Sequence, residues 1–263
     1  MKRFFVRAIV STVICIWSAT ALGQPQFDIQ SFNQKFETAQ WLYQYDIIAW
    51  WTSDSILAAP KEEQSKLGGE WFCFQEKDIW HAAYGKYVND QFEQVFHYTV
   101  DTASKVRRVY NPIDTFLANS YSRALRNANR QIKPLKDTVN VRFNQFIKRN
   151  DDQTLSIWLL PAFSQSGVAV YGGEFYYKFD PSGQVMLDKT EYFQGQFKGF
   201  KADNPREIWL NYRDVEKPTL GAIFFVWYYK KYFTRITIDN KPSNSTVLFE
   251  PDKGYYWIHV VKD

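Results

Sequence analysis

The sequence predicts an α+β protein in which a predominantly antiparallel β-sheet packs with two main α-helices. Two long stretches carry apolar residues at helical spacing, and the remainder is rich in short alternating or apolar runs. Turn signals separate neighbouring runs, and strands joined by short turns pair antiparallel. Helices among such strands define the α+β class.

The N-terminus, MKRFFVRAIVSTVICIWSATALGQ, has the pattern of a secretory signal peptide. Three cations precede a short apolar stretch, and small residues at Ala19, Ala21 and Gly23 offer a cleavage site. The stretch is shorter than the roughly 20 residues that span a bilayer. We therefore expect cleavage of residues 1–23, a periplasmic or secreted protein, one domain over 24–263, and no transmembrane segment in the mature chain.

Cleavage changes the charge and the cysteine count. The formal net charge falls from +4 to +1, because the leader holds three cations and no acid. A charge this small gives no global attraction to nucleic acid, so we expect no nucleic-acid partner. Cys73 is then the single cysteine, which excludes a disulfide scaffold.

A helix is expected over about 32–58, with Ser31 as N-cap and Gln34 completing a capping box. Its apolar residues fall on two faces, so we expect the helix to lie buried between other elements. The first face holds Phe36, Ala39, Tyr43, Ile47 and Trp50, and the second holds Trp41, Tyr45, Ile48 and Trp51. A polar loop should follow at 61–70, and a strand at about 70–76.

Residues 78–101 are expected to form a β-hairpin that turns at Asn89–Asp90, which places Lys86 opposite Glu93. This register pairs His97 with Ala82 and sends His81 and His97 to opposite faces. A bulge at Gly85 would reverse that orientation and allow a shared metal site. Two ordinary half-buried histidines are the simpler interpretation, and we expect no metal.

A second helix is expected over about 112–132, with Asn111 as N-cap and Pro112 at the first helical position. Arg123, Arg126, Arg130 and Lys133 follow steps of three and four residues, so they form one basic stripe. Residues 102–149 carry eleven Lys and Arg against two Asp, a local net charge of +9. Such a stripe attracts anionic partners, although a solvated helix face is the alternative.

The C-terminal part, 139–263, is expected to be rich in strands. Asp180-Pro181-Ser182-Gly183 predicts the turn of a hairpin. Further strands are expected near 207–213, 220–230, 233–239, 245–250 and 255–261. The run GAIFFVWYYKKYF is apolar on both faces of a strand and ends at two lysines, so we expect a central, buried strand and no membrane span.

The chain contains no HExxH, CxxC or GxSxG motif, and neither the Walker nor the Rossmann glycine pattern. Cys73 lies among aromatic residues, which favours an inert buried thiol over a nucleophile activated by a histidine. Glu174, Asp188 and Glu191 surround one predicted hairpin and could supply the two acids of a glycosidase. We assign no catalytic residue, no metal ligand and no cofactor.

The sequence thus favours a non-catalytic binding or interaction module of the cell envelope. Its partner would be an anionic envelope component or an acidic protein, bound at the basic stripe. The alternative is an envelope polysaccharide hydrolase with paired carboxylates in an aromatic cleft. A weaker alternative is a structural part of a larger envelope assembly, which an exposed apolar face on 41–51 or 221–233 would indicate.

Overall fold

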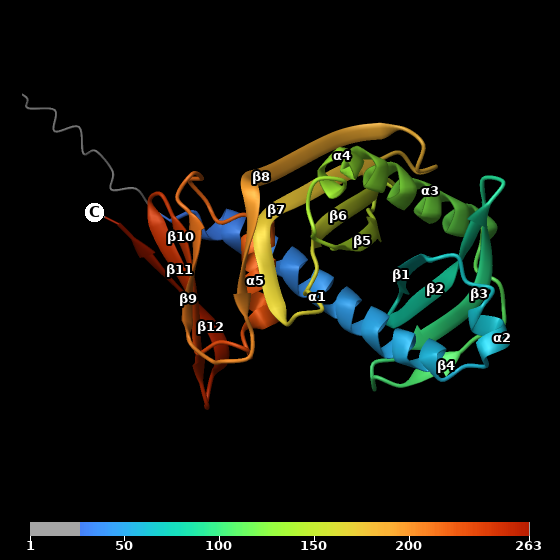
Figure 1. Ribbon diagram of the computed structural model, residues 1–263, viewed down its shortest axis with the longest axis horizontal. Coiled ribbons are helices and arrows are strands. Elements are labelled where there is room, and N and C mark those ends of the chain that lie inside the picture. Colours follow the sequence, from blue (N-terminus) through green and yellow to red (C-terminus); the bar gives the residue numbers. More distant parts are fainter. Residues whose placement is uncertain (1–26, 263) are drawn as a thin grey trace, which may run out of the picture.

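The computed structural model describes residues 27–262, so the predicted signal peptide lies outside the described residues. Within this range the chain forms twelve strands in three four-stranded sheets, together with five helices. All but one of the strand pairs are antiparallel. The predicted α+β class, with mostly sheet, is therefore confirmed, although the sheet is divided into three (Figure 1).

The first sheet is an antiparallel meander in chain order. Its hairpin turns at Asn89 and Asp90, both with positive φ, and Lys86 lies opposite Glu93 with Nζ and Oε2 2.9 Å apart. The predicted turn and cross-strand pair are confirmed. The strands are β1 (Glu70–Glu76), β2 (Ile79–Val88), β3 (Gln91–Val100) and β4 (Val106–Arg108).

The second sheet is also an antiparallel meander, and its last two strands are long. The Asp180–Gly183 turn joins them as predicted, with the Gly183 amide donating to the Asp180 carbonyl at 2.9 Å. The strands are β5 (Phe143–Arg149), β6 (Leu155–Pro161), β7 (Val168–Phe179) and β8 (Met186–Lys201).

The third sheet has the order β12-β11-β10-β9 and contains the single parallel pair, β9 with β10. Parallel neighbours need a crossover connection, and helix α5 (Leu220–Tyr229) supplies it. The strands are β9 (Glu207–Tyr212), β10 (Arg235–Asn240), β11 (Ser243–Glu250) and β12 (Gly254–Val261), close to four of the five predicted C-terminal strands.

Helix α1 (Ile29–Leu57) runs diagonally from the third sheet to the first (Figure 1). It packs against the first sheet at one end, where the amide of Cys73 donates to Tyr45 Oη at 2.8 Å. At the other end Phe32 lies edge-on to Trp257 of β12, with ring centroids 5.0 Å apart. The expected burial between elements is confirmed, except that Trp50 is 60% exposed.

Helix α3 (Thr115–Gln131) lies between the first and second sheets, with contacts to strands of both. Both long helices begin at different residues from those predicted. The carboxylate of Asp28 caps α1 by accepting from the amide of Ser31, and Asp114 caps α3 by accepting from Leu117. Asp is as good an N-cap as Ser or Asn, so local sequence does not choose between neighbouring candidates. Two short helices, α2 (Lys61–Gln64) and α4 (Lys133–Lys136), complete the set, the former within the predicted polar loop.

The predicted strand at 220–230 is wrong, because this segment is helix α5. Thr219 caps the helix, with its hydroxyl accepting from the amide of Ala222 at 3.2 Å. Phe224 and Phe225 are both nearly fully buried, so the expected burial of the run is confirmed. A segment that is apolar on every side has neither a two-residue nor a 3.6-residue period, and periodicity cannot distinguish a buried strand from a buried helix.

Asp46 of α1 is a buried carboxylate with 4% exposure. It accepts hydrogen bonds from Tyr228 Oη of α5 at 2.7 Å and from Asn144 Nδ2 of β5 at 3.2 Å. Burial raises the pKa of Asp46 to about 6, because both partners are neutral and the tyrosine offsets only part of the desolvation. Asp46 therefore links α1, α5 and β5, and the cost of this link is the burial of a carboxylate.

Asp46→Asn should become more stable relative to the native protein as the pH rises from 4 to 7. Because the native-state pKa is raised, the protonated carboxyl of Asp46 favours the native state of the unmutated protein. This contribution is fully present below the unfolded-state pKa of 3.8 and is lost as the pH rises through about 6. The difference in free energy of unfolding should grow by up to about 3 kcal/mol, at 1.36 kcal/mol per pKa unit. Urea denaturation at several pH values measures it. Asp54→Asn, at an exposed position of α1, is the control, and a difference independent of pH would contradict the assignment.

Candidate functional site

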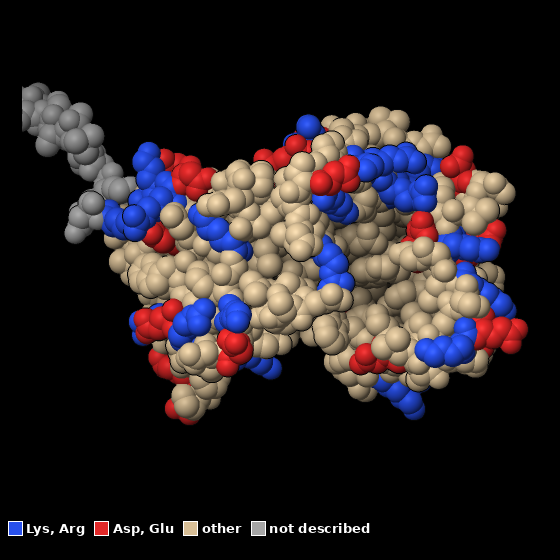
Figure 2. Space-filling model, in the orientation of Figure 1, with Lys and Arg blue, Asp and Glu red and all other residues tan. Residues whose placement is uncertain are grey.

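The basic residues of α3 lie on one face of the helix, as their spacing predicts. Ala124, Leu125 and Ala128 on the opposite face are buried. Lys136 of α4 extends the row, because the chain resumes a helical turn after Ile132. Figure 2 shows Lys and Arg gathered over α3 at the upper right, beside a hollow in the surface. We call this surface the basic groove, formed by Arg123, Arg126, Arg130, Lys133 and Lys136.

Three adjoining hollows, of about 270, 320 and 280 Å³, make up the groove. All three are lined in part by Arg126, so they adjoin one another along α3. The first reaches β1 and the Gly68–Gly69 loop, the second reaches the turn of the β2–β3 hairpin, and the third lies over α4. The row from Arg123 to Lys136 is about 20 Å long, at 1.5 Å per helical residue.

Two of the arginines are fixed by neighbouring elements. Arg123 Nη1 donates to the carbonyl of Ser182 at 2.8 Å, and Arg126 Nη1 lies 3.0 Å from Glu70 Oε1. The Arg126 guanidinium also lies 4.6 Å from the ring centroid of Tyr87, within cation–π range. These contacts come from the β7–β8 turn and from the first sheet, so the groove depends on the tertiary arrangement.

The charges of the groove are only partly neutralised. Arg126 pairs with Glu70, and Lys133 pairs with Asp137 at 2.7 Å. Among residues 27–262, Arg123, Arg130 and Lys136 have no carboxylate within 4.0 Å. Arg130 and Lys136 instead donate to the neutral side chains of Asn127 and Asn129, and burial lowers the pKa of the Lys136 amine. The groove thus presents three cations without an acidic partner.

The predicted stripe omits Lys136, because the second helix was expected to end near residue 132, before Pro134. Proline is tolerated in the first turn of a new helix, and α4 begins directly before it. The step of three residues from Lys133 to Lys136 was the signal that could have added this residue to the stripe.

The two histidines of the β2–β3 hairpin are in contact. The register shifts between Tyr84 and Gly85, which leaves Val95 as the extra residue and pairs His97 with Ala83. The register without a bulge is therefore wrong, and the alternative with a bulge at Gly85 is confirmed. His81 Nδ1 lies 2.9 Å from His97 Nε2.

The histidine pair is satisfied within the protein. His97 Nδ1 lies 3.2 Å from the carbonyl of Asn111 and so donates to it, which leaves Nε2 to accept from His81. Burial lowers the pKa of both imidazoles, and for His81 the neighbouring His97 lowers it further. No group of three or more His, Cys, Asp or Glu side chains converges on one point within residues 27–262.

Cys73 lies on the face of β1 that packs against α1, and its side chain is fully buried. Burial raises the pKa of the thiol well above its ordinary value. A buried, protonated thiol is a poor nucleophile, which agrees with the inert interpretation.

The three carboxylates of the β7–β8 hairpin are not brought together. Glu174 lies opposite Tyr192 and Glu191 opposite Phe175, so these two acids point to opposite faces of the sheet. Asp188 lies four residues before Tyr192 on β8. It is therefore about 13 Å along the strand from the position opposite Glu174. Glu174 accepts from the amide of Gly221 and serves the start of α5, and burial raises its pKa. These three residues therefore do not supply the pair of neighbouring acids that the hydrolase hypothesis requires.

The apolar segments 41–51 and 221–233 offer no broad exposed face. Trp50 is the single exposed apolar side chain of the first segment, and Tyr232 is the exposed aromatic of the second. No helix within residues 27–262 has the length and apolar character needed to cross a membrane. Comparison of the chain with protein-family models, with curated proteins and with solved structures finds no match.

Gly183→Ala should destabilise the protein by about 2–5 kcal/mol and displace the turn that holds Arg123. Gly183 has a φ of +72°, and an added Cβ would lie 2.3 Å from the carbonyl oxygen of Ser120 on α3. The left-handed backbone costs about 1–2 kcal/mol with a side chain, and the clash adds about 1–3 kcal/mol.

Gly167→Ala is the matched control for this variant, because its φ is +75° and nothing lies within 4 Å of its added Cβ. Chemical denaturation of both variants separates the clash from the backbone cost. Equal losses of stability would show that the turn does not press against α3.

Proposed function

We propose that the protein is an exported, non-catalytic binding module that holds an extended anionic polymer of the cell envelope in the basic groove. The observation that carries this proposal is the set of three cations, Arg123, Arg130 and Lys136, that line two adjoining hollows and form no ion pair among residues 27–262. A solvated helix face needs no concavity and no neighbouring elements to shape it.

The form of the groove favours a polymer over a small anion. Its cations are spread over about 20 Å of helix, and the three hollows join at Arg126. A single phosphate or carboxylate would contact one hollow, whereas a chain of repeating anionic groups can contact all three. Tyr87 and Trp71 line the groove and add apolar surface beside the charges.

Arg123→Gln with Arg130→Gln should weaken the binding of heparin, used as a sulfated polymer probe, by roughly tenfold at 50 mM NaCl. Each exposed ion pair contributes up to about 1 kcal/mol, and 1.4 kcal/mol is a factor of ten in affinity. The salt dependence of binding should also become shallower, because fewer charges are screened. Titration calorimetry at several NaCl concentrations measures both effects, with neutral dextran as the control ligand.

Lys105→Gln with Lys201→Gln is the matched control. Both lysines are exposed and form no ion pair among residues 27–262, and the two substitutions remove the same total charge. Its affinity should change less than twofold. Equal weakening by both double variants would mean that net charge alone attracts heparin, and the groove would have no special role. If an acidic protein bound tightly and heparin did not bind, the ligand of the groove would be a protein and not a polymer.

A further inference from the structure

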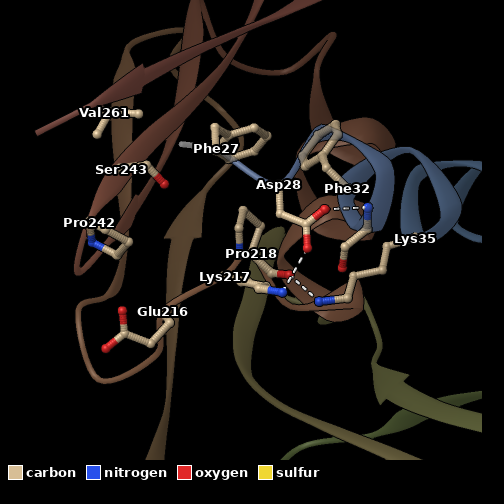
Figure 3. Close-up of a pocket in the computed structure, with 11 residues that line it drawn as sticks. Phe27, Asp28, Phe32, Lys35, Glu216, Lys217, Pro218, Pro242, Ser243 and Val261 are labelled. Atoms are coloured by element: carbon tan, nitrogen blue, oxygen red, sulfur yellow. Dashed lines mark hydrogen bonds and ion pairs between the residues drawn. The ribbon is translucent and has the colours of Figure 1, made fainter. Parts of the chain in front are cut away.

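A second cavity lies at the opposite end of the molecule from the basic groove. It has a volume of about 200 Å³ and is enclosed by the start of α1, the loop before α5, the β10–β11 turn and the end of β12. Figure 3 shows these four segments converging on it. Its apolar lining includes Phe27, Phe32 and Val261, and its charged lining includes Asp28, Lys35 and Lys217.

One wall of the cavity is aromatic and firmly packed. Phe32 is 3% exposed, and its ring centroid lies 4.3 Å from that of His259. Phe27 stacks on the same imidazole at 4.0 Å. His259 in turn lies 2.9 Å from Ser245 Oγ through its Nδ1, and burial lowers its pKa to about 4. The histidine is therefore neutral at ordinary pH, and this side of the cavity is an apolar surface held in place.

Most of the charged side chains at the cavity form ion pairs. Asp28 is neutralised by Lys217, with Oδ2 and Nζ 2.7 Å apart, and Glu216 by Lys241 at 3.1 Å. Lys35 forms no ion pair among residues 27–262, and its amine donates one hydrogen bond, to the carbonyl of Pro218 at 2.7 Å.

Lys35 is half-buried, and its amine points toward Pro218 and Lys217 (Figure 3). An ammonium has three donors, so two remain for a ligand. The cavity therefore combines apolar walls with one ammonium that forms no ion pair among residues 27–262.

We propose that this cavity binds a small amphiphilic carboxylic acid, with the carboxylate on the Lys35 ammonium and the hydrocarbon against Phe27, Phe32 and Val261. One unpaired cation matches a monoanion, and the second lysine is already committed to Asp28. A cavity of about 200 Å³ suits a short chain or a single ring. Filling apolar walls while pairing the charge is the usual design of a small-molecule site.

Octanoate is a suitable probe for this site. It should bind the purified protein in titration calorimetry, and hexanoate, with two fewer methylenes, should bind about 15-fold more weakly, because each buried methylene adds roughly fourfold in affinity. Octanamide has the same chain without the charge and should also bind about tenfold more weakly than octanoate. Absence of octanoate binding at millimolar concentration, or equal affinities of octanoate and octanamide, would overturn the proposal.

Two variants locate the site. Lys35→Met keeps the length of the side chain and should abolish the preference for octanoate over octanamide. Lys66→Met, at an exposed position just after α2, is the control and should leave the preference unchanged. Val261→Phe reduces the cavity while leaving Lys35 in place, and should weaken both ligands at least tenfold.

Thermal unfolding without ligand shows whether each variant is folded. Unchanged octanoate binding by Val261→Phe would place the ligand elsewhere and overturn the assignment, as would an unchanged preference in Lys35→Met. Heparin binding should be the same in all these variants, which separates this site from the basic groove.

Discussion

The long helix α1 is the constraint on which the rest of the structure depends. An isolated helix with aromatic residues on several sides would expose a large apolar surface, so it is stable only when other elements cover it. The first sheet covers one end through Tyr45, the third sheet covers the other through Phe32, and α5 crosses the middle through the hydrogen bond to Asp46. Through these contacts and the hydrogen bond from Asn144 of β5, α1 contacts all three sheets.

Polar groups buried along this helix fix how the elements meet. Asp46 accepts from Tyr228 and Asn144, and Thr52 Oγ1 lies 2.7 Å from Tyr84 Oη on β2. Lys230, at the end of α5, is similarly enclosed, with Nζ 3.8 Å from the ring centroid of Trp227, and burial lowers its pKa to about 8. Apolar contacts permit sliding between elements, whereas a buried hydrogen bond is lost if its partners shift, so these groups favour one arrangement.

The two proposed sites follow from this architecture. The basic groove forms where α3 meets the β7–β8 turn and the edge of the first sheet, and the second cavity forms where α1 begins against the third sheet. The cations of the groove come from α3 and α4, the unpaired lysine of the cavity comes from α1, and the walls of both come from segments distant in the chain. Arg126 is held by Glu70, and Lys35 by the carbonyl of Pro218.

The sequence alone determined the α+β class, the positions of both long helices, the hairpin turn and the basic stripe, because each depends on spacing within one segment. Tertiary structure decided the rest. Residues 220–229 became a helix because Thr219 and Glu174 satisfy its first amides in the core. The histidines meet because the β2–β3 register shifts at Gly85, where an added Cβ would lie 2.1 Å from the Glu93 carbonyl oxygen. The second cavity brings together four distant segments, and no local pattern encodes such a contact.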